Sequence, residues 1–589
     1  MNNAHAAKEW ASMDPNPLTR KYIEEATPEA IEGMFSKRIA FGTAGLRSKM
    51  LPGPANMNDL VIIQTAQGLA EYILSLSPPS NPTAVVGYDH RENPSLNLSS
   101  EGFAKLTKAV FDSYGISTTL LDGFVPTPLV PFAVKEQKAS CGIMVTASHN
   151  PKEDDGYKVY WSNACQIVSP HDKNISTFID ANLTPKQSYD TSSVTADSAL
   201  TESYLDKYFS CIESDLVLTT PPTPHPSSPL SLPTFVYTAM HGIGHPFTSR
   251  SFSTFSLPPF CPVGSQCDPD PTFPTVSFPN PEEKGALDEA MKLAEAEDKD
   301  IVLANDPDAD RLAVAERDRA TGTWTVFKGD QIGVLLGHWM WESFGRSAPA
   351  GTKCAMLASA VSSKMLKAVA EKEGFLFEET LTGFKWIGSR NLDLQSEGYK
   401  VLFSYEEAIG FCCGDMIVDK DGVSAAGVFA QMATHLYVSA GMSVSQHLQR
   451  LYSTYGEFVS NNGYFFCYDP AVVAKIISGI RNGGEYFKEV AGYEVAGIRD
   501  LGEPGYDSSK PDNKPTLPTS ASSPMITISF TNGCVAQFRA SGTEPKFKYY
   551  VEMAGKPGVQ RSQVEEELNV MVDKLLETLL SPSANGLTR

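Results

Sequence analysis

The sequence predicts an α/β protein of several domains, in which mostly parallel strands alternate with helices. Short apolar runs at 83–89, 142–147 and 300–306 are typical of buried strands, and patterns such as 60–74 are typical of helices between them. With 589 residues the chain is too long for one core, so we expect three or four domains. Functional side chains are then expected on loops at the carboxyl ends of the strands.

The composition is that of an ordinary globular protein, with 42% hydrophobic and 20% charged residues. Lys and Arg number 48 against 69 Asp and Glu, which gives a formal net charge of −21. Nucleic acids and anionic membrane surfaces would be repelled, so neither is expected as a partner. A small phosphorylated ligand is compatible with this charge if Arg and Lys gather in one cleft.

The ten cysteines are scattered and form no CxxC pair, which indicates free thiols and a reducing compartment. The N-terminal stretch lacks the apolar core of a signal peptide, and no run reaches membrane-spanning length. We therefore expect a cytoplasmic protein, and nothing in the sequence argues against a monomer.

Two segments rich in Pro and Ser, 219–233 and 503–524, interrupt the α/β pattern. Such segments have little chance of a packed core, so we interpret them as surface insertions or linkers. The apolar spacing of 564–580 predicts an amphipathic helix that docks onto the last domain.

Three carboxylates follow one apolar run: Asp306, Asp308 and Asp310 alternate at a spacing of two. Alternate side chains of an extended or tightly turned loop share one side, so the three would converge and repel unless a cation compensates. Oxygen ligands of this kind select Mg²⁺. A calcium-binding EF-hand loop needs Gly at its sixth position and Glu at its twelfth. Those positions are Arg311 and Arg317 here, so an EF-hand is excluded. The alternative is a solvated acidic turn.

The stretch GIMVTASHNP places Ser148 and His149 directly after another apolar run. A serine hydroxyl is a poor nucleophile unless a base or a metal activates it, and neighbours on a strand point to opposite faces. A phosphorylated Ser148 would instead give a fourth oxygen to a cation held by the three Asp. Lys158 would act as acid or base if burial lowered its pKa. The alternative is an ordinary polar turn.

Other loops add groups suited to a sugar phosphate. In RASGTEP a guanidinium, two hydroxyls and a glycine amide outline a phosphate cradle, formed by Arg539, Ser541, Gly542 and Thr543. A turn between Gly42 and Gly45 presents Arg47. Donors and acceptors for sugar hydroxyls come from Lys385, Glu406 and Glu407.

Taken together, these stretches resemble the α-D-phosphohexomutase superfamily along essentially the whole chain. TASHNP matches its phosphoserine signature, DPDADR its metal loop, EEAIG its sugar loop and RASGTEP its distal phosphate loop, in the family's order. RIAFGTAGLR, YTAMHGIG and TLTGFKWIG are similar to the phosphoglucomutase branch that includes eukaryotic phosphopentomutases.

The resemblance implies four domains around a central cleft, three related α/β sandwiches and a C-terminal α+β domain with an antiparallel sheet. The expected domains are 1–205 with the phosphoserine loop, 206–346 with the metal loop, 347–462 with the sugar loop, and 463–589 with the distal phosphate loop.

The resemblance also implies roles for individual residues. Ser148 would carry the phosphoryl group and, with Asp306, Asp308 and Asp310, bind Mg²⁺. The transferring phosphate would be surrounded by Arg47, His149, Lys158 and Arg311. The sugar would meet Thr382, Gly383, Lys385 and Glu406, and the distal phosphate would meet Arg539, Ser541, Gly542 and Thr543.

The implied reaction moves a phosphoryl group between C1 and C5 or C6 of an aldose phosphate, through phosphoserine and a bisphosphate that reorients. Glucose 1,6-bisphosphate or a pentose bisphosphate would be the activator. Many hexose-preferring members carry Ser where this chain has Ala408, and losing that hydroxyl weakens discrimination at the matching sugar hydroxyl. This favours pentose phosphates, with glucose 1-phosphate also accepted.

Three alternative functions compete with this interpretation. A haloacid-dehalogenase phosphatase does not fit, because its DxD is followed by x-Thr or x-Val and neither DxD of this chain is. A non-catalytic scaffold would be expected to lose Ser148 or a metal ligand, and all are present. An enzyme that acts mainly as a phosphoglucomutase, or as a glucose 1,6-bisphosphate synthase, remains compatible with the pattern.

Overall fold

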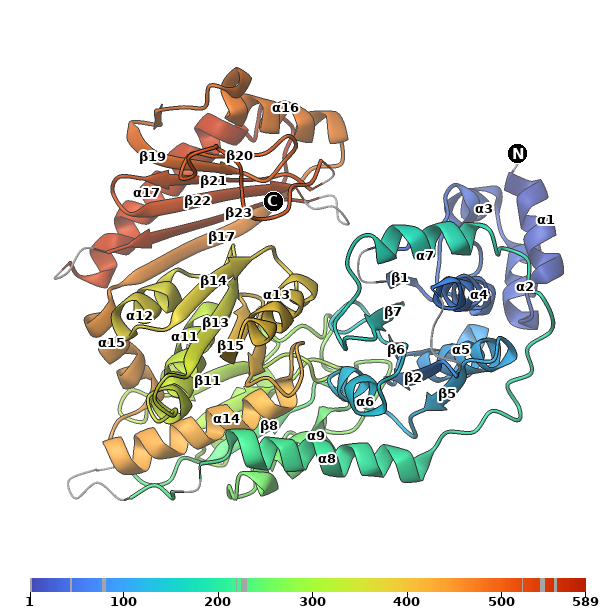
Figure 1. The fold of residues 1–589 in the computed structure, drawn as a ribbon, viewed down its shortest axis with the longest axis horizontal. Coiled ribbons are helices and arrows are strands. Elements are labelled where there is room, and N and C mark those ends of the chain that lie inside the picture. The colour runs from blue at the N-terminus through green and yellow to red at the C-terminus, as the bar shows by residue number, and fades with distance from the viewer. Residues whose placement is uncertain are drawn as a thin grey trace. The chain divides into compact units, whose positions relative to one another are not determined.

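The computed structural model describes residues 3–42, 45–76, 81–218, 220–223, 230–521, 523–540, 546–555 and 559–589. It divides into two compact units. The first comprises Met1–Leu357 and Gly383–Ser445, and the second comprises Ala358–Thr382 and Gln446–Arg589. Figure 1 labels their helices and strands. Among the described helices, none is both long and apolar enough to cross a lipid bilayer.

The first sheet of unit 1 has five strands in the order β1-β7-β6-β2-β5. They are β1 (Gly45–Lys49), β7 (Asp154–Trp161), β6 (Cys141–Val145), β2 (Thr83–Tyr88) and β5 (Ser117–Leu120). Strands β5, β2 and β6 are parallel, whereas β7 runs antiparallel to β6 and β1. The surrounding helices are α4 (Asp59–Ser75), α5 (Ser100–Ser113), α6 (Leu129–Gln137) and α7 (His171–Asp180). Helices α1 (Asn3–Met13), α2 (Pro17–Glu25) and α3 (Pro28–Phe35) precede them.

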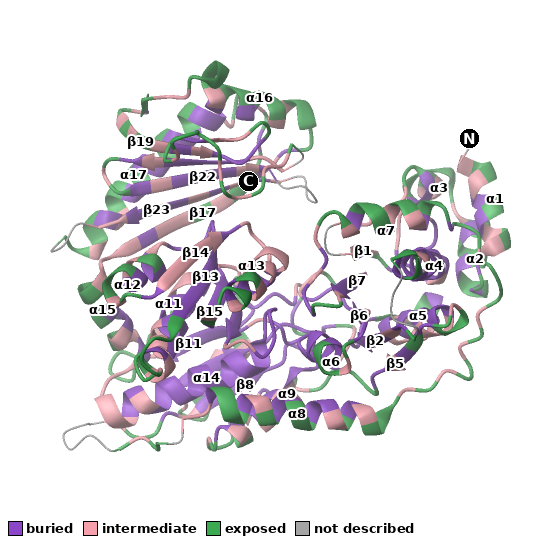
Figure 2. Ribbon diagram, in the orientation of Figure 1, coloured by how far each residue is buried: buried purple, intermediate pink, exposed green. Residues whose placement is uncertain are grey.

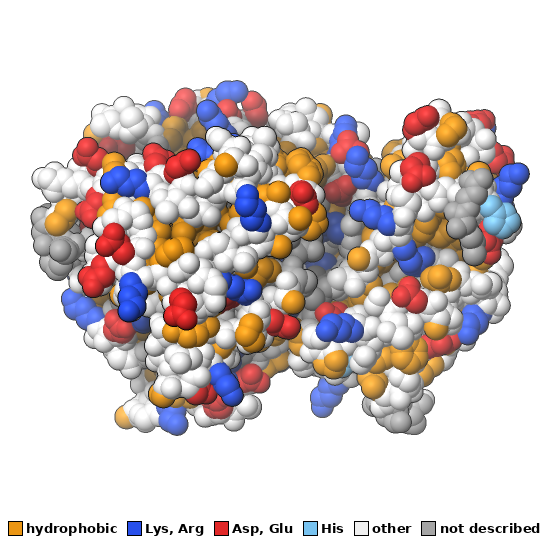
Figure 3. All heavy atoms as spheres, turned by 90° about the horizontal axis from the view of Figure 1, so that it is seen from above, with side chains coloured by type: hydrophobic (Ala, Val, Ile, Leu, Met, Phe, Trp, Pro, Cys, Tyr) orange, Lys and Arg blue, Asp and Glu red, His pale blue; other side chains and the backbone are white. Residues whose placement is uncertain are grey.

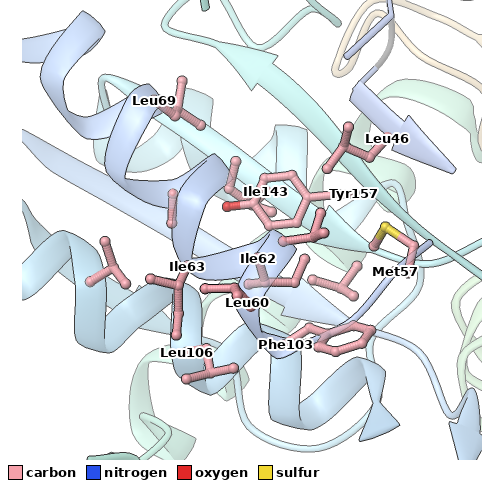
Figure 4. Packing of buried hydrophobic residues seen from close by; sticks show 14 of the residues in the cluster. Leu46, Met57, Leu60, Ile62, Ile63, Leu69, Phe103, Leu106, Ile143 and Tyr157 are labelled. Atoms are coloured by element: carbon pink, nitrogen blue, oxygen red, sulfur yellow. The ribbon is translucent and has the colours of Figure 1, made fainter. Parts of the chain in front are cut away.

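Helix α4 organises the core of this domain. It begins after Asn58, whose side chain accepts a hydrogen bond from the Val61 amide and so caps the helix. Helices α5 and α7 both pack against it, so nearly every side chain of α4 is buried. Figure 4 shows Leu60 of α4 close to Phe103 of α5, and Ile63 of α4 close to Leu106 of α5. This packing fixes the sheet whose strand β6 leads into the Ser148 loop.

The second sheet has the order β12-β11-β10-β8-β9. Its strands are β8 (Phe235–Thr238), β9 (Cys261–Pro262), β10 (Ile301–Ala304), β11 (Ala313–Arg317) and β12 (Trp324–Val326). Strands β9, β8 and β10 are parallel, and β11 is antiparallel to β10 and β12. The helices α8 (Ser198–Leu216), α9 (Gly244–Thr254) and α10 (Asp288–Ala296) belong to this part of the chain.

A third sheet includes β13 (Lys353–Ser359), β15 (Tyr399–Glu406) and β16 (Gly410–Cys413). Its helices are α11 (Gly329–Met340), α13 (Phe384–Ser396) and α14 (Gly422–His435). Helix α14 packs against α9, α11 and β16, and Figure 2 shows it as a largely buried helix. Asp421 caps its N-terminus by accepting hydrogen bonds from the amides of Val423 and Ser424.

Unit 2 contains a C-terminal antiparallel sheet in the order β17-β23-β22-β21-β19-β18, with β20 paired to β19. The strands are β17 (Phe458–Phe466), β18 (Glu489–Val490), β19 (Tyr493–Asp500), β20 (Tyr506–Asp507), β21 (Met525–Phe530), β22 (Cys534–Ala540) and β23 (Lys546–Ala554). Its other elements are α12 (Met365–Glu373), β14 (Leu376–Thr380), most of α15 (Val444–Tyr455), α16 (Pro470–Arg481) and α17 (Arg561–Leu580).

The predicted C-terminal helix is confirmed as α17, which packs on β17 and β23 through Val564, Leu568 and Leu575. Residues 503–521 are mostly exposed or half-buried, in agreement with a surface insertion. Of the other insertion, 219 and 224–229 lie outside the described residues. In Figure 3 acidic and basic side chains are interspersed over the face shown, so the net negative charge forms no single patch there.

The predicted α/β class is confirmed, with one refinement to the expected mostly parallel sheets. Strands β6 and β7, and likewise β10 and β11, are joined by short loops without a helix, and such connections produce antiparallel pairs. Both loops therefore begin at the carboxyl end of a parallel strand and return into the same sheet. These two loops carry Ser148 and the three Asp.

We expect Leu60→Ala to destabilise the first domain. The side chain is fully buried, and truncation to Ala leaves a cavity that costs about 2–5 kcal/mol. The measurement is urea unfolding followed by circular dichroism, with Leu76→Ala, at a position that is 50% exposed, as the control. Equal unfolding midpoints for the two variants would contradict the central role assigned to α4.

Candidate active site

The loop between β10 and β11 brings three carboxylates together. Asp306, Asp308 and Asp310 are fully buried, and each offers an oxygen within 4.8 Å of the others. Ala309 adopts a left-handed conformation with φ of 57°, and its amide donates to the Asp306 carbonyl, so the loop turns tightly there. The predicted convergence of the three side chains is confirmed, and the alternative of a solvated acidic turn is excluded by their burial.

Three cations face this triad. Lys158 Nζ lies 2.7 Å from Asp308 Oδ2 and 3.0 Å from Asp310 Oδ2. Lys420 Nζ lies 3.3 Å from Asp310 Oδ2, and Arg311 Nε lies 3.8 Å from Asp310 Oδ1. Buried carboxylates in such proximity need opposite charges, because removal from water strongly disfavours unpaired ions.

The triad also fits a divalent cation. Asp308 Oδ1 and Asp310 Oδ1 are buried and have no hydrogen-bond partner within the described part of the chain. Buried acceptors without partners are costly, and carboxylate oxygens are the ligands that Mg²⁺ prefers. A second group that lies close enough for metal ligation, His245, Cys267 and Asp268, is only partly buried and mixes nitrogen, sulfur and oxygen. The all-oxygen triad is therefore the better match to Mg²⁺.

The loop between β6 and β7 places Ser148 against the triad. Ser148 Oγ donates a hydrogen bond of 2.7 Å to Asp306 Oδ2, and its side chain is buried. Its φ of 52° lies in the left-handed region that non-glycine residues rarely adopt, and its amide donates to Thr146 Oγ1 at 2.9 Å. Backbone strain of this kind often marks functional sites.

His149 is a second titratable group beside the serine, with Nδ1 3.3 Å from Ser148 Oγ. Burial lowers the pKa of His149 well below its usual value, and the guanidinium groups of Arg311 and Arg47 lower it further. The imidazole is therefore neutral at pH 7.

Lys158 is brought to the site, but the condition attached to its role as acid or base is not met. Burial acts to lower the pKa of Lys158, but the carboxylates of Asp308 and Asp310 outweigh burial and raise it above its usual value. The sequence left this condition open, because it does not reveal which charges surround a buried amine. Lys158 is held here as a cation.

Arg47 reaches the nucleophile loop from the neighbouring edge strand. Strand β1 pairs with β7 so that Arg47 lies opposite Gly156, and Arg47 Nη1 donates to Asn150 Oδ1 at 2.8 Å. Asn150 in turn donates to Asp154 Oδ2 at 3.0 Å. The guanidinium is thereby placed beside the loop that carries Ser148.

The predicted sugar loop is tied to the metal loop. Arg311 Nη1 donates to the Ala408 carbonyl at 2.7 Å, and the Leu312 amide donates to the Ile409 carbonyl at 3.1 Å. Glu406, at the end of β15, is buried, and burial raises its pKa although Lys420 and Arg311 act in the opposite direction. The structure thus places Glu406 in the same charged network as the triad.

The remaining predicted residues are divided between the two units. Gly383 precedes α13 with φ of 107°, and Lys385 in the first turn lies with Nζ 5.3 Å from the Trp386 ring centroid. Thr382 belongs to unit 2, and its buried hydroxyl lacks a hydrogen-bond partner among the described residues. Arg539 is half-buried on β22, opposite Lys548 of β23. Ser541, Gly542 and Thr543 lie outside the described residues.

Sequence reasoning missed two residues of the network. Thr127, in the loop before α6, donates through Oγ1 to Asp308 Oδ2 at 2.6 Å and through its amide to the Asp308 carbonyl at 3.0 Å. No local signal distinguishes it. Lys420 stands between Asp419 and Asp421 in an otherwise apolar stretch before α14. These three consecutive charged residues were the sequence signal that could have identified Lys420 as a functional residue.

Comparisons with known proteins agree with this geometry. Models of the phosphoglucomutase/phosphomannomutase α/β/α domains I, II and III match residues 38–186, 206–322 and 328–455. The chain is 45% identical to a human phosphopentomutase, over 98% of this chain and 96% of that protein. It is 43% identical to the phosphoribomutase of Saccharomyces cerevisiae over 92% and 91% of the two chains, and 43% identical to a human glucose 1,6-bisphosphate synthase over 99% and 95%.

Two solved structures share the fold. The open form of parafusin, a phosphoglucomutase from Paramecium, superposes with a TM-score of 0.64 at 18% identity and covers 92% of this chain and 95% of its own. A phosphomannomutase-like protein from Thermus thermophilus gives 0.63 at 20% identity over 92% and 98%. With family models over most of the chain and full-length relatives above 40% identity, the chain belongs to the phosphoglucomutase/phosphomannomutase family of the α-D-phosphohexomutase superfamily, in the branch of the eukaryotic phosphopentomutases.

Proposed function

We propose that the protein is a phosphosugar mutase that moves a phosphoryl group between C1 and C5 or C6 of an aldose phosphate. Ribose and deoxyribose 1-phosphates are the preferred substrates, and glucose 1-phosphate is also accepted. The observation that carries the proposal is the contact of Ser148 Oγ with Asp306, which sets a hydroxyl at the rim of a buried carboxylate triad. The phosphopentomutase and phosphoribomutase relatives support the choice of substrate.

In this proposal Ser148, once phosphorylated, gives its phosphoryl group to the free hydroxyl of a sugar monophosphate. A new P–O bond to the sugar forms as the bond to Ser148 Oγ breaks, and the resulting bisphosphate turns and returns its other phosphoryl group to Oγ. Such transfers depend chiefly on position and on positive charge around the equatorial oxygens. Arg47, Lys158 and Arg311 supply that charge. Neutral His149, 3.3 Å from Oγ, is assigned to accept the proton that the sugar hydroxyl loses and to return it to Oγ as the bond to Ser148 breaks.

Mg²⁺ would be held by Asp306, Asp308 and Asp310, together with an oxygen on Ser148. When bound, it would polarise the phosphoryl group and offset its charge. Asp308 Oδ1 and Asp310 Oδ1, which accept no hydrogen bond within the described residues, support this assignment. Glucose 1,6-bisphosphate or a pentose bisphosphate is proposed as the activator that phosphorylates Ser148.

Both ends of the bisphosphate need a site. We assign the sugar hydroxyls to Thr382, Gly383, Lys385 and Glu406. We assign the distal phosphate to Arg539, Ser541, Gly542 and Thr543. Ala408 offers the sugar no hydroxyl, and its carbonyl is occupied by Arg311, so this position adds little discrimination in favour of a hexose.

The four-domain division at 205, 346 and 462 remains part of this proposal, and the three family-model matches support it.

All ten cysteines are free of disulfides in the described part of the chain, which supports a reducing location such as the cytoplasm.

We expect mutase turnover with Mg²⁺ and a trace of glucose 1,6-bisphosphate, with a higher kcat/KM for ribose 1-phosphate than for glucose 1-phosphate. Ser148→Ala should lower kcat by more than about 10³-fold, because no hydroxyl remains to carry the phosphoryl group. The matched control is Ser140→Ala, directly before β6, the strand whose other end leads into the Ser148 loop. A glucose preference would contradict the reading of Ala408, and unchanged turnover of Ser148→Ala would refute the phosphoserine mechanism.

The same preparation distinguishes the second candidate, a glucose 1,6-bisphosphate synthase, which the 43% identity to the human synthase favours. Glucose 1-phosphate is supplied together with 1,3-bisphosphoglycerate as donor. Net formation of glucose 1,6-bisphosphate that exceeds mutase turnover would replace the proposed function by this one.

Asp308→Asn is expected to weaken binding of Mn²⁺, used as a spectroscopic substitute for Mg²⁺, by about 10-fold or more, because a charged oxygen ligand becomes a neutral amide. Binding is measured by electron paramagnetic resonance, and kcat should fall in parallel. Asp190→Asn, in an exposed loop, is the control. Equal Mn²⁺ affinity of the two variants would remove the triad as the metal site.

A further inference from the structure

Arg91, in the loop after β2, is a buried cation outside the triad's own network. Its side chain is 1% exposed, and its guanidinium donates four hydrogen bonds to main-chain carbonyls. Nη1 donates to Pro151 and Asp154 at 2.8 and 2.9 Å. Nη2 donates to Ser148 and Asn150, at 2.7 Å in both cases. All four acceptors belong to the loop that carries the nucleophile.

This loop makes few main-chain bonds of its own. The Asn150 amide donates to the Ala147 carbonyl at 3.1 Å, and the Asp154 amide donates to the Pro151 carbonyl at 3.0 Å. Ser148 holds a left-handed φ of 52°, a conformation that costs a non-glycine residue about 1–3 kcal/mol unless its surroundings impose it. Arg91 bonds the carbonyl of this strained residue itself and three carbonyls of the residues that follow it, so the guanidinium holds the backbone in the path that the left-handed serine requires.

Contacts with Asp89 and Phe273 hold Arg91 itself in place. Its amide donates to Asp89 Oδ1 at 3.0 Å, and its Nε lies 3.5 Å from Asp89 Oδ2. Ser100 Oγ donates to Asp89 at 2.6 Å and lies 3.1 Å from Asp155 Oδ2. The guanidinium carbon also lies 5.5 Å from the ring centroid of Phe273. The plane of the guanidinium group is thus held in one orientation. The ammonium group of a lysine, at the end of a flexible side chain, cannot present the same planar set of donors.

We propose that Arg91 is a positioning residue for the phosphoryl transfer. It touches no reacting atom; it sets the loop from Ser148 to Asp154 so that Oγ points at Asp306 and Asn150 receives Arg47. This inference rests on the proposed function only for its effect on turnover, because the effect on the loop is independent of any substrate.

The first test is Arg91→Lys, which keeps the positive charge opposite Asp89 but cannot bind four carbonyls. We expect kcat to fall by about 10²-fold, the usual result of displacing a reacting group by 1 Å, with KM nearly unchanged. Arg250→Lys is the control, since Arg250 lies on α9 and pairs with Asp206 through an exposed contact. An Arg91→Lys protein with unchanged kcat would overturn the proposal.

The second test separates positioning from general stability. Arg91→Ala is assayed with and without added guanidinium ion, which can occupy the space of the lost group. We expect recovery of at least tenfold in kcat, at a guanidinium concentration that leaves the control variant unaffected. If guanidinium fails to restore turnover to a folded Arg91→Ala protein, Arg91 serves stability alone and the proposal fails.

A third readout needs no activity. Hydrogen exchange of the peptide that spans residues 147–154, measured by mass spectrometry, should be faster in Arg91→Lys than in the unchanged protein, while exchange in α4 stays the same. If exchange changes in this way and the unchanged protein shows no turnover, the proposed function fails and the assignment of Arg91 to the loop stands. Equal exchange in both proteins would overturn the assignment itself.

Discussion

The burial of three carboxylates in one loop is the constraint on which the rest of this site depends. Asp306, Asp308 and Asp310 have almost no contact with solvent, so their charges must be matched by protein groups or by a bound cation. Lys158 on β7 and Lys420 in the loop before α14 meet this requirement from two distant parts of the chain, and Arg311 meets it locally. The site is therefore also a junction that joins separate parts of unit 1.

Side-chain hydrogen bonds connect the loops that meet at this junction. From the first sheet, Ser148 and Thr127 donate to Asp306 and Asp308. Toward the third sheet, Arg311 donates to the carbonyl of Ala408 in the sugar loop. The contacts that assemble the site therefore also supply hydrogen bonds to its buried carboxylates.

The loop of Ser148 shows a second way in which this fold positions chemistry. A short connection between antiparallel strands makes few hydrogen bonds of its own, and here a buried arginine supplies them. The left-handed serine can then persist because the surrounding structure over-determines it. Arg91 was not among the residues singled out by the motifs, since its function depends on main-chain carbonyls that leave no trace in side-chain patterns.

The sequence by itself determined the α/β class, the spacing of the three Asp and the identity of Ser148, because periodicity and local motifs encode strands, loops and ligand types. Only the tertiary structure decided that Lys158 is a cation with a raised pKa, that Thr127 and Lys420 join the triad, and that β7 and β11 return antiparallel. The contacts of Lys158, Thr127 and Lys420 with the triad join residues about 110 to 180 positions apart, and the antiparallel strands follow from the length of the connecting loops. The pKa of a buried charge depends on its neighbours in space, which local sequence patterns do not reveal.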